Sequence, residues 1–277
     1  ERLLLDGNDE AAELLSHGNY IVADSRENLA MVSRQKGLEA VAKKNIPPYD
    51  TRIDSGISQQ MNVQKILFPV DHLTEETLEE AITYMAAYLE ENRDARVHLF
   101  TRNAEFSRES NLLKQVGSIL RRGGYPPGWA GKTNQKQVET WLDEEEQIPI
   151  LFSVEQCVNE LSVNKCVREQ RLLVDLADTP DLFLQISCVS MGIPQVLKTA
   201  TQYMRPGKNG RVNRDLSKLG EDLRYYLDSL TNWNEASIQS YSLGKTHTTQ
   251  YLIEQWKEVI VSIGNSTSIA AGAGRFQ

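Results

Sequence analysis

The side chains that could do chemistry are concentrated in one segment, Thr179–Val196, which reads TPDLFLQISCVSMGIPQV. It follows the apolar run Leu172–Leu176, whose length and composition predict a buried strand. The segment itself predicts a short helix that ends at a Gly-x-Pro turn, Gly192–Pro194. Hydroxyl and amide groups on such a helix can hydrogen-bond a ligand, but they carry no negative charge and act poorly as general bases. The polar side chains on the helix are Gln185, Ser187 and Ser190.

Motifs for metal binding, phosphate binding and nucleophilic catalysis are absent. The sequence contains no HExxH, P-loop, GxSxG or GxGxxG pattern. The acidic run Asp143–Glu146 is better explained as the solvated end of a helix than as a metal site. We therefore predict no metal ion and no cofactor. Four histidines without metal-ligand spacing are expected to be structural or at the surface: His17, His72, His98 and His247.

Composition and charge limit the class of protein. The 277 residues are 40% hydrophobic and 25% charged, which suits a globular chain of about two domains. The net charge of −8, with both signs mixed, argues against a nucleic-acid partner. No apolar run approaches the roughly 20 residues of a membrane span, and the first residues, ERLLLDGNDE, do not resemble a signal peptide. Because an initiator Met is missing, we expect the chain to be part of a longer protein.

The cysteines predict a reducing compartment. Three cysteines without a CxxC pair do not suggest a disulfide framework. Cys188 lies among apolar neighbours, so we expect it to be a small buried hydrophobic residue. The other two are Cys157 and Cys166.

Strands and helices alternate along most of the chain. A helix capped by Thr74 follows the first of the main strands, and Phe106–Arg122 and Gln135–Glu146 are the next expected helices. Such alternation predicts an α/β fold with a Rossmann-like parallel sheet and helices on both faces. The strands expected in this sheet are Lys65–Val70, Val97–Thr101, Ile148–Ser153, Leu172–Leu176 and, as the last, Pro194–Thr199.

The two ends of the chain have other patterns. Tyr20–Ala23 predicts a strand that is followed by a helix to about Gln35, whereas residues 37–60 show no sustained periodicity. A further helical stretch starts at Asn234, is interrupted near Gly244 and includes Trp256. Before it, leucines at helical spacing predict one long helix with a buried stripe: Leu216, Leu219, Leu223, Leu227 and Leu230.

The order of these features resembles the second half of the GT-B glycosyltransferases. The strand, helix and Gly-x-Pro turn are followed by the turn Gly207–Gly210, by a helix that starts near Asp215 and by the terminal helix. The resemblance implies a chain truncated in the N-terminal domain. Residues 1–45 would end the N-terminal Rossmann-like domain, 46–62 would be a connector and 63–232 the C-terminal Rossmann-like domain. Residues 233–264 would form a helical segment that crosses back, and 265–277 a flexible tail.

The donor site of this fold is degenerate in the sequence. Retaining enzymes of the type place two carboxylates eight residues apart, and the family's spacing, counted back from Pro194, assigns these positions to Ser187 and Thr179. The Arg and Lys that the family uses to neutralise a pyrophosphate are replaced by the acidic stretch Asp71–Glu76. Without these electrostatic groups we expect no catalysis. The degenerate donor-cleft positions are Thr179, Ser187, Gly192, Pro194, Gln195, Asn209 and Gly210.

Four sequence blocks give a closer resemblance. They resemble the accessory Sec system proteins with a degenerate GT-B fold, and they are Pro48–Arg52 with Gly56–Gln60, Arg171–Leu176 with Pro180–Leu182, Gln185–Ile186 with Gly192–Gln195, and Tyr225–Leu227 with Leu230–Asn234. The resemblance implies a non-catalytic adaptor for the export of glycosylated serine-rich-repeat adhesins in Gram-positive bacteria. It also implies a cytoplasmic location at the inner face of the membrane. The implied partners are two other accessory Sec proteins, the accessory SecA motor ATPase and the adhesin.

The role of the cleft stays open in the sequence. It would bind a glycan or a partner protein, with Asp50, Arg52 and Gln59 as further candidate contacts. One alternative is an active GT-B glycosyltransferase that contacts a nucleotide-sugar donor through Asp50, Arg52, Lys208 and Asn209. The other is a non-catalytic partner of a glycosyltransferase that recognises glycopeptide.

Overall fold

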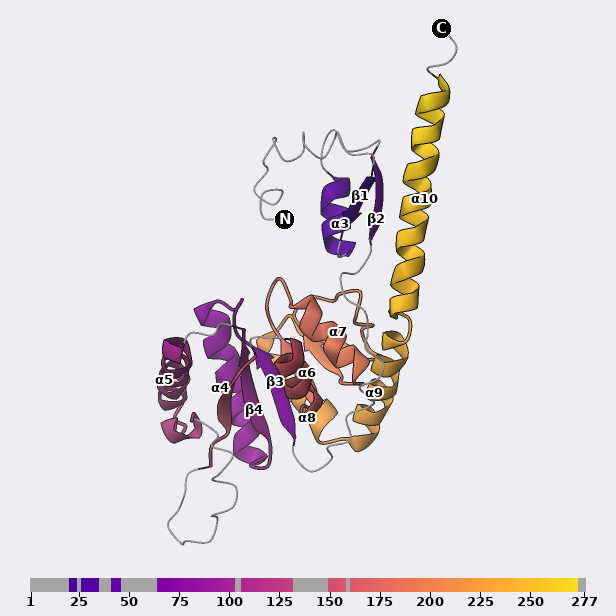
Figure 1. The fold of residues 1–277 in the computed structure, drawn as a ribbon. Helices are drawn as coiled ribbons and strands as arrows, with labels where there is room; N and C mark the ends of the chain where they lie inside the picture. The colour runs from indigo at the N-terminus through magenta and orange to yellow at the C-terminus, as the bar shows by residue number, and fades with distance from the viewer. Residues whose placement is uncertain are drawn as a thin grey trace. The chain divides into compact units, whose positions relative to one another are not determined.

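The computed structural model describes residues 20–23, 26–34, 41–45, 64–102, 106–131, 149–157 and 160–273. The chain forms two compact units (Figure 1). Residues 52–245 form the larger unit, and residues 1–51 form the smaller one together with residues 246–277.

The larger unit is built on a six-stranded sheet. Every pair of neighbouring strands is parallel, and the strand order is β5-β4-β3-β6-β7-β8. The order reverses direction between β3 and β6, which is the switch point of a doubly wound sheet. The predicted α/β class with a parallel sheet is confirmed. The strands are β3 (Lys65–Pro69), β4 (Arg96–Thr101), β5 (Phe152–Gln156), β6 (Leu172–Asp175), β7 (Gln195–Leu197) and β8 (Gly210–Val212).

Two strand predictions were wrong in detail. The sheet does not end at β7, because β8 pairs with it at the edge. With only three residues, of which one is glycine and one arginine, β8 offers no apolar alternation to read. The strand β5 also begins at Phe152, later than the predicted Ile148.

Helices cover both faces of this sheet. The predicted helix Gln135–Glu146 lies outside the described residues, and the sequence analysis gave no indication of α6. The helices are α4 (Glu75–Glu91), α5 (Phe106–Arg122), α6 (Glu160–Arg168), α7 (Leu182–Ser190), α8 (Leu219–Leu227) and α9 (Leu230–Gly244), with short 3₁₀ turns at η2 (Pro127–Trp129) and η4 (Leu216–Lys218).

Alternate residues of each strand belong to different cores. Ile66 and Phe68 pack in one hydrophobic cluster with residues of α4, α5 and α8, whereas Leu67 packs in a second cluster with residues of α6 and α7. Successive side chains of a strand point to opposite faces, so two cores are required. This arrangement explains why the strands are apolar throughout rather than alternating.

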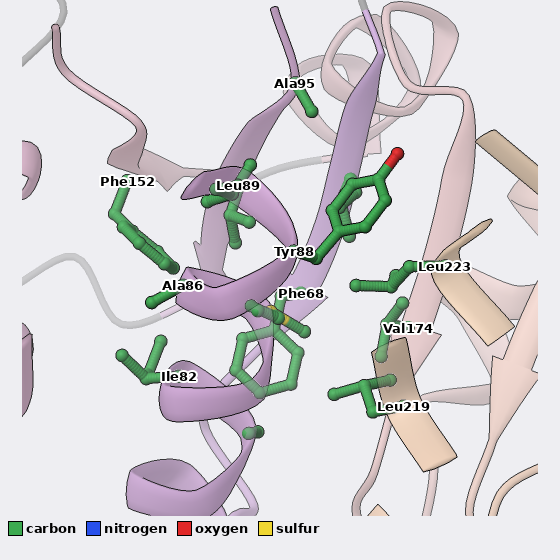
Figure 2. Packing of buried hydrophobic residues seen from close by; sticks show 14 of the residues in the cluster. Phe68, Ile82, Ala86, Tyr88, Leu89, Ala95, Phe152, Val174, Leu219 and Leu223 are labelled. Atoms are coloured by element: carbon green, nitrogen blue, oxygen red, sulfur yellow. The ribbon is translucent and has the colours of Figure 1, made fainter. Parts of the chain in front are cut away.

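Helix α4 shows how the larger core is closed. Thr74 caps the helix by accepting a hydrogen bond from the Thr77 backbone N–H. Figure 2 shows the Tyr88 ring inside the cluster with its hydroxyl at the border. That oxygen lies 2.8 Å from the Asp228 carboxylate and 3.0 Å from Gln64 Oε1. Burial, and then the hydrogen bond to Asp228, raise the pKa of Tyr88, which stays a neutral donor.

The predicted leucine stripe spans the 3₁₀ turn η4 and the helices α8 and α9 rather than one helix. Helix α8 ends at Leu227, and α9 starts at Leu230 with Ser229 as its N-cap, accepting from the Asn232 backbone N–H. Leu230 is therefore at the first turn of a new helix, and it is 45% exposed. The leucine spacing alone suggests one helix, because the N-cap that begins α9 is a single residue, Ser229.

The smaller unit combines both ends of the described chain. The strand β1 (Tyr20–Ala23) pairs in parallel with β2 (Ala42–Asn45), and α3 (Arg26–Ser33) connects them. The Lys44 ammonium forms an ion pair with Glu258 on α10 (Thr249–Ala273). Helix α10 continues to Ala273, so most of the segment predicted as a flexible tail is helical. None of the helices in the described ranges has the length and hydropathy needed to cross a bilayer.

Candidate functional site

Doubly wound sheets bind ligands outside the carboxyl ends of their strands, at the switch point. Here that point lies between β3 and β6, and each of these strands has an aspartate at its carboxyl end. Asp71 comes two residues after β3, and Asp175 is the last residue of β6. The Asp71 carboxylate accepts hydrogen bonds from Thr101 Oγ1 at 2.6 Å and from the Arg102 backbone N–H at 2.8 Å. This carboxylate therefore connects the ends of β3 and β4.

Asp175 is the most unusual titratable group at this edge. Its side chain is 1% exposed, and it accepts hydrogen bonds from the backbone N–H groups of Ala177 at 3.2 Å and Asp181 at 3.1 Å. Burial raises the pKa of Asp175 to about 7, although the two hydrogen bonds act in the opposite direction. The carboxyl group orders the turn that leads from β6 into α7.

The N-terminus of α7 is occupied by the chain itself. Asp181 caps the helix by accepting a hydrogen bond from the Leu184 backbone N–H at 3.0 Å. Arg102 donates to the same carboxylate at 2.8 Å and lies over the Phe183 ring, 5.0 Å from its centroid. Helix N-termini attract phosphates because their backbone N–H groups are unpaired and the helix dipole is positive there. The Asp181 carboxylate occupies the place of such a phosphate at the N-terminus of α7. The Arg102 guanidinium is already paired with this carboxylate.

We expect Asp181→Ala to lower the free energy of unfolding by about 1–2 kcal/mol, since it removes both the N-cap and the ion pair with Arg102. The matched control is Asp178→Ala in the same connection, where the exposed carboxylate contacts Lys198 at 2.7 Å. That change should cost less than about 0.5 kcal/mol. Urea unfolding followed by circular dichroism measures both, and equal losses would contradict the cap assignment.

The two positions that replace the family's carboxylates lie on either side of Asp181. Thr179 is exposed in the connection between β6 and α7. Ser187 is buried within α7, where its hydroxyl donates to the Phe183 carbonyl at 2.9 Å. That hydroxyl is therefore engaged with the helix backbone rather than presented to a ligand.

The other five donor-cleft positions lie at the opposite, amino edge of the sheet. Gln195 and Gly210 are the first residues of β7 and β8, and the Gln195 backbone N–H donates to the Asn209 carbonyl at 3.1 Å. Gly192 has a φ of 71°, a left-handed conformation that lets the chain turn from α7 into β7 through Pro194. The structure does not bring these residues together with Thr179.

Asn209 has a structural role in its loop. Its side-chain oxygen accepts from the Arg205 backbone N–H at 2.6 Å, and its amide donates to the Tyr203 carbonyl at 3.2 Å. Both polar ends of this buried side chain thus hold the loop that precedes β8. The sequence prediction placed Asn209 in the cleft because its neighbours form a turn motif, and this assignment stays a prediction.

The remaining candidate contacts, Asp50, Arg52 and Gln59, lie outside the described residues. The sequence analysis in turn did not single out Arg102, Asp175 or Asp181. A signal was present for two of them: Asp175 ends a buried apolar run, and Asp181 precedes one, as N-caps do.

Within the ranges that the structure describes, no group of three or more His, Cys, Asp or Glu side chains could hold a metal ion. His98 is buried beside Gln170, with 3.1 Å between His98 Nδ1 and Gln170 Nε2. Burial, and then the charge of Lys65, lower the pKa of His98 to about 4, so it is neutral at pH 7. All three cysteines are buried, as predicted for Cys188.

Comparison with known families decides the affiliation. The family model for accessory Sec system protein 1 matches residues 6–262 of this chain. The chain belongs to this family of accessory Sec system proteins. The curated relative of the same description from Streptococcus gordonii is 27% identical over 245 residues, which are 88% of this chain and 46% of that protein. The chain therefore spans about half the length of the curated relative.

Solved structures show the fold. The structure of accessory secretory proteins 1, 2 and 3 in Streptococcus pneumoniae superposes with a TM-score of 0.65 at 24% identity, over 93% of this accessory Sec chain and 47% of that one. The HepE protein of Anabaena, in complex with UDP and glucose, gives 0.66 at 13% identity, over 92% of this chain and 66% of HepE. The predicted resemblance to an accessory Sec protein with a GT-B-like fold is confirmed.

Proposed function

We propose that the protein is a non-catalytic adaptor of the accessory Sec secretion system that aids the export of glycosylated serine-rich-repeat adhesins. The observation that carries the non-catalytic part is the state of the α7 N-terminus. Asp181 caps it and Arg102 is paired with Asp181, so the groups that would hold a donor phosphate are already used.

The charge at the switch point supports the same proposal. A nucleotide-sugar donor carries a negatively charged pyrophosphate, and transfer requires positive groups near the leaving phosphate. Here the end of β3 provides the Asp71 carboxylate and the start of α7 provides that of Asp181, whereas the raised pKa of Asp175, about 7, leaves this group partly protonated at neutral pH. Like charges at short range repel, most strongly where burial lowers the effective dielectric constant.

The proposed partners follow from the family. The S. pneumoniae structure contains accessory secretory proteins 1, 2 and 3 together, so we propose two other accessory Sec proteins as partners. The accessory SecA motor ATPase and the adhesin are proposed from the sequence resemblance. The location proposed on the same ground is the cytoplasmic face of the membrane, without a nucleic-acid partner.

The proposed domain boundaries are those given by the sequence. Residues 1–45 would end the N-terminal Rossmann-like domain, 46–62 would connect, and 63–232 would form the C-terminal one. The division into compact units supports the return of the terminal segment, because residues 246–277 group with residues 1–51, whereas residues 233–245 group with the larger unit. We assign α10 to the segment that returns to the N-terminal domain.

Calorimetry and co-purification with the full-length protein test the proposal. We expect no heat of binding from UDP-sugars or GDP-sugars, and recovery of both other accessory Sec proteins from cells in stoichiometric amounts. Donor turnover would overturn the adaptor and support an active glycosyltransferase. Recovery of a glycosyltransferase without any Sec component would instead support a glycopeptide-recognising partner.

A further inference from the structure

A small cavity lies between the edge strand β8, the end of α8 and the start of α9. Its volume is about 180 Å³, below the roughly 300–1,000 Å³ of pockets that hold drug-sized ligands. We propose that it binds one neutral sugar ring, independently of the switch point. The side chains that carry this proposal are Lys208, Arg211, Tyr225, Asn232 and Glu235.

Two of these side chains are held in place before any ligand arrives. The Arg211 guanidinium pairs with Asp222 at 3.1 Å and lies 4.7 Å from the Tyr225 ring centroid. Asn232 donates its amide N–H to the Tyr225 backbone carbonyl at 3.1 Å, which orients the side-chain oxygen. A site whose polar groups are already fixed loses less conformational entropy on binding.

The charges in the cavity favour a neutral ligand. Lys208 and Glu235 have opposite charges, and across the described residues neither has an ion-pair partner. The charge of Arg211 is balanced by Asp222. A phosphate would be repelled by Glu235, and an amine by Lys208. Hydroxyl groups act both as donors and as acceptors, so a polyol can bond to both kinds of side chain.

The apolar part of the cavity is aromatic. The Tyr225 side chain is 41% exposed and packs edge-to-face on the buried Tyr226, with 5.0 Å between the ring centroids. Ala236 is the aliphatic side chain of the lining. An aliphatic anchor of a partner protein would therefore bury little surface here, whereas the C–H face of a sugar can lie on an exposed ring.

The location separates this cavity from a nucleotide-sugar site. Gly207 and Lys208 precede β8 and Arg211 lies within it, on the edge of the sheet and away from the ends of β3 and β6. Sugar binding here needs no donor phosphate and no catalytic group. The inference therefore goes beyond the adaptor function and would hold or fail independently of it.

Saturation-transfer NMR on the full-length protein tests the proposal, with the methyl glycosides of glucose, galactose and N-acetylglucosamine as probes. We expect transfer to the ring protons of at least one glycoside. Tyr225→Ala should weaken its binding by roughly tenfold, whereas Tyr225→Phe keeps the ring and should bind as the wild type does. Glu221→Gln, on the exposed side of α8, is the matched surface control and should change nothing.

A second variant distinguishes a sugar from other ligands. Glu235→Gln removes a hydrogen-bond acceptor of full charge, so a neutral glycoside should bind more weakly. Inorganic phosphate, used as a competing probe, should not displace the glycoside from the wild type, because Glu235 repels it. The proposal is overturned if phosphate displaces the glycoside from the wild type, if saturation passes from the folded protein to none of the three glycosides, or if glycoside binding is unchanged in Tyr225→Ala.

Discussion

Gly210→Ala is expected to lower the free energy of unfolding by about 3 kcal/mol or more, at the upper end of the range for overpacked cores. A Cβ at Gly210 would lie 2.5 Å from the Gln195 carbonyl oxygen and 2.7 Å from the Met204 side chain. Met204 could move, but the Gln195 carbonyl belongs to β7, which pairs with β8 at this residue. The backbone of the edge strand must therefore shift.

Gly220→Ala is the control for this substitution. Gly220 is in α8, and its added Cβ would meet only Arg224 Nη1, at 3.4 Å. There the higher helix propensity of alanine should raise stability by up to about 1 kcal/mol. Urea unfolding gives both values. A Gly210→Ala protein as stable as the wild type would show that Gly210 is not a packing residue.

The second large effect concerns Asp175 and pH. The pKa of this carboxyl group is raised by burial from 3.8 to about 7, so the native state keeps a proton that the unfolded chain releases. Its contribution to stability is complete below about pH 4 and is lost as the pH rises to about 7. At 1.36 kcal/mol per pKa unit, this loss amounts to at most about 4 kcal/mol.

Asp175→Asn should remove this dependence. The wild type should lose up to about 4 kcal/mol of unfolding free energy relative to the variant between pH 4 and pH 8. Thermal or urea unfolding across this range measures the difference. A constant difference between the two proteins would mean that the native carboxyl ionises near its ordinary pKa.

The comparison with a variant is needed because His98 acts in the opposite direction. Burial lowers the pKa of His98 from 6.5 to about 4, so its contribution is complete above pH 6.5 and is lost as the pH falls to about 4. In the wild type, the stability lost from Asp175 and the stability gained from His98 largely cancel as the pH rises from about 4 to 6.5. His98 is present in both proteins, so it drops out of the difference.

The sequence predicted the elements whose pattern is local. The strands β3, β4 and β6 and the helices α4 and α5 are apolar runs or helical stripes long enough to be recognised. The strands β2 and β8 could not be found this way. The first has the sequence AKKN and the second GRV, and they become strands only through pairing with β1 and β7.

The site was less predictable than the fold. The spacing that led to Thr179 and Ser187 points to α7 and the connection before it, but it gives no information about which residues share an edge of the sheet. Position on the carboxyl or amino edge depends on where each strand starts and ends. Arg102 and Asp181 are 79 residues apart in sequence and meet only because the end of β4 and the start of α7 lie near one another.

The cap on α7 also determines how a free anion would have to compete for that position. Asp181 is joined to the helix it caps, so its effective concentration there does not fall on dilution and is commonly millimolar or higher for short connections. A phosphate in solution would have to displace this carboxylate and its pairing with Arg102 at the same time. The helix end therefore behaves as a site already occupied by an intramolecular ligand, and a nucleotide sugar would bind there only after overcoming the free energy of that cap.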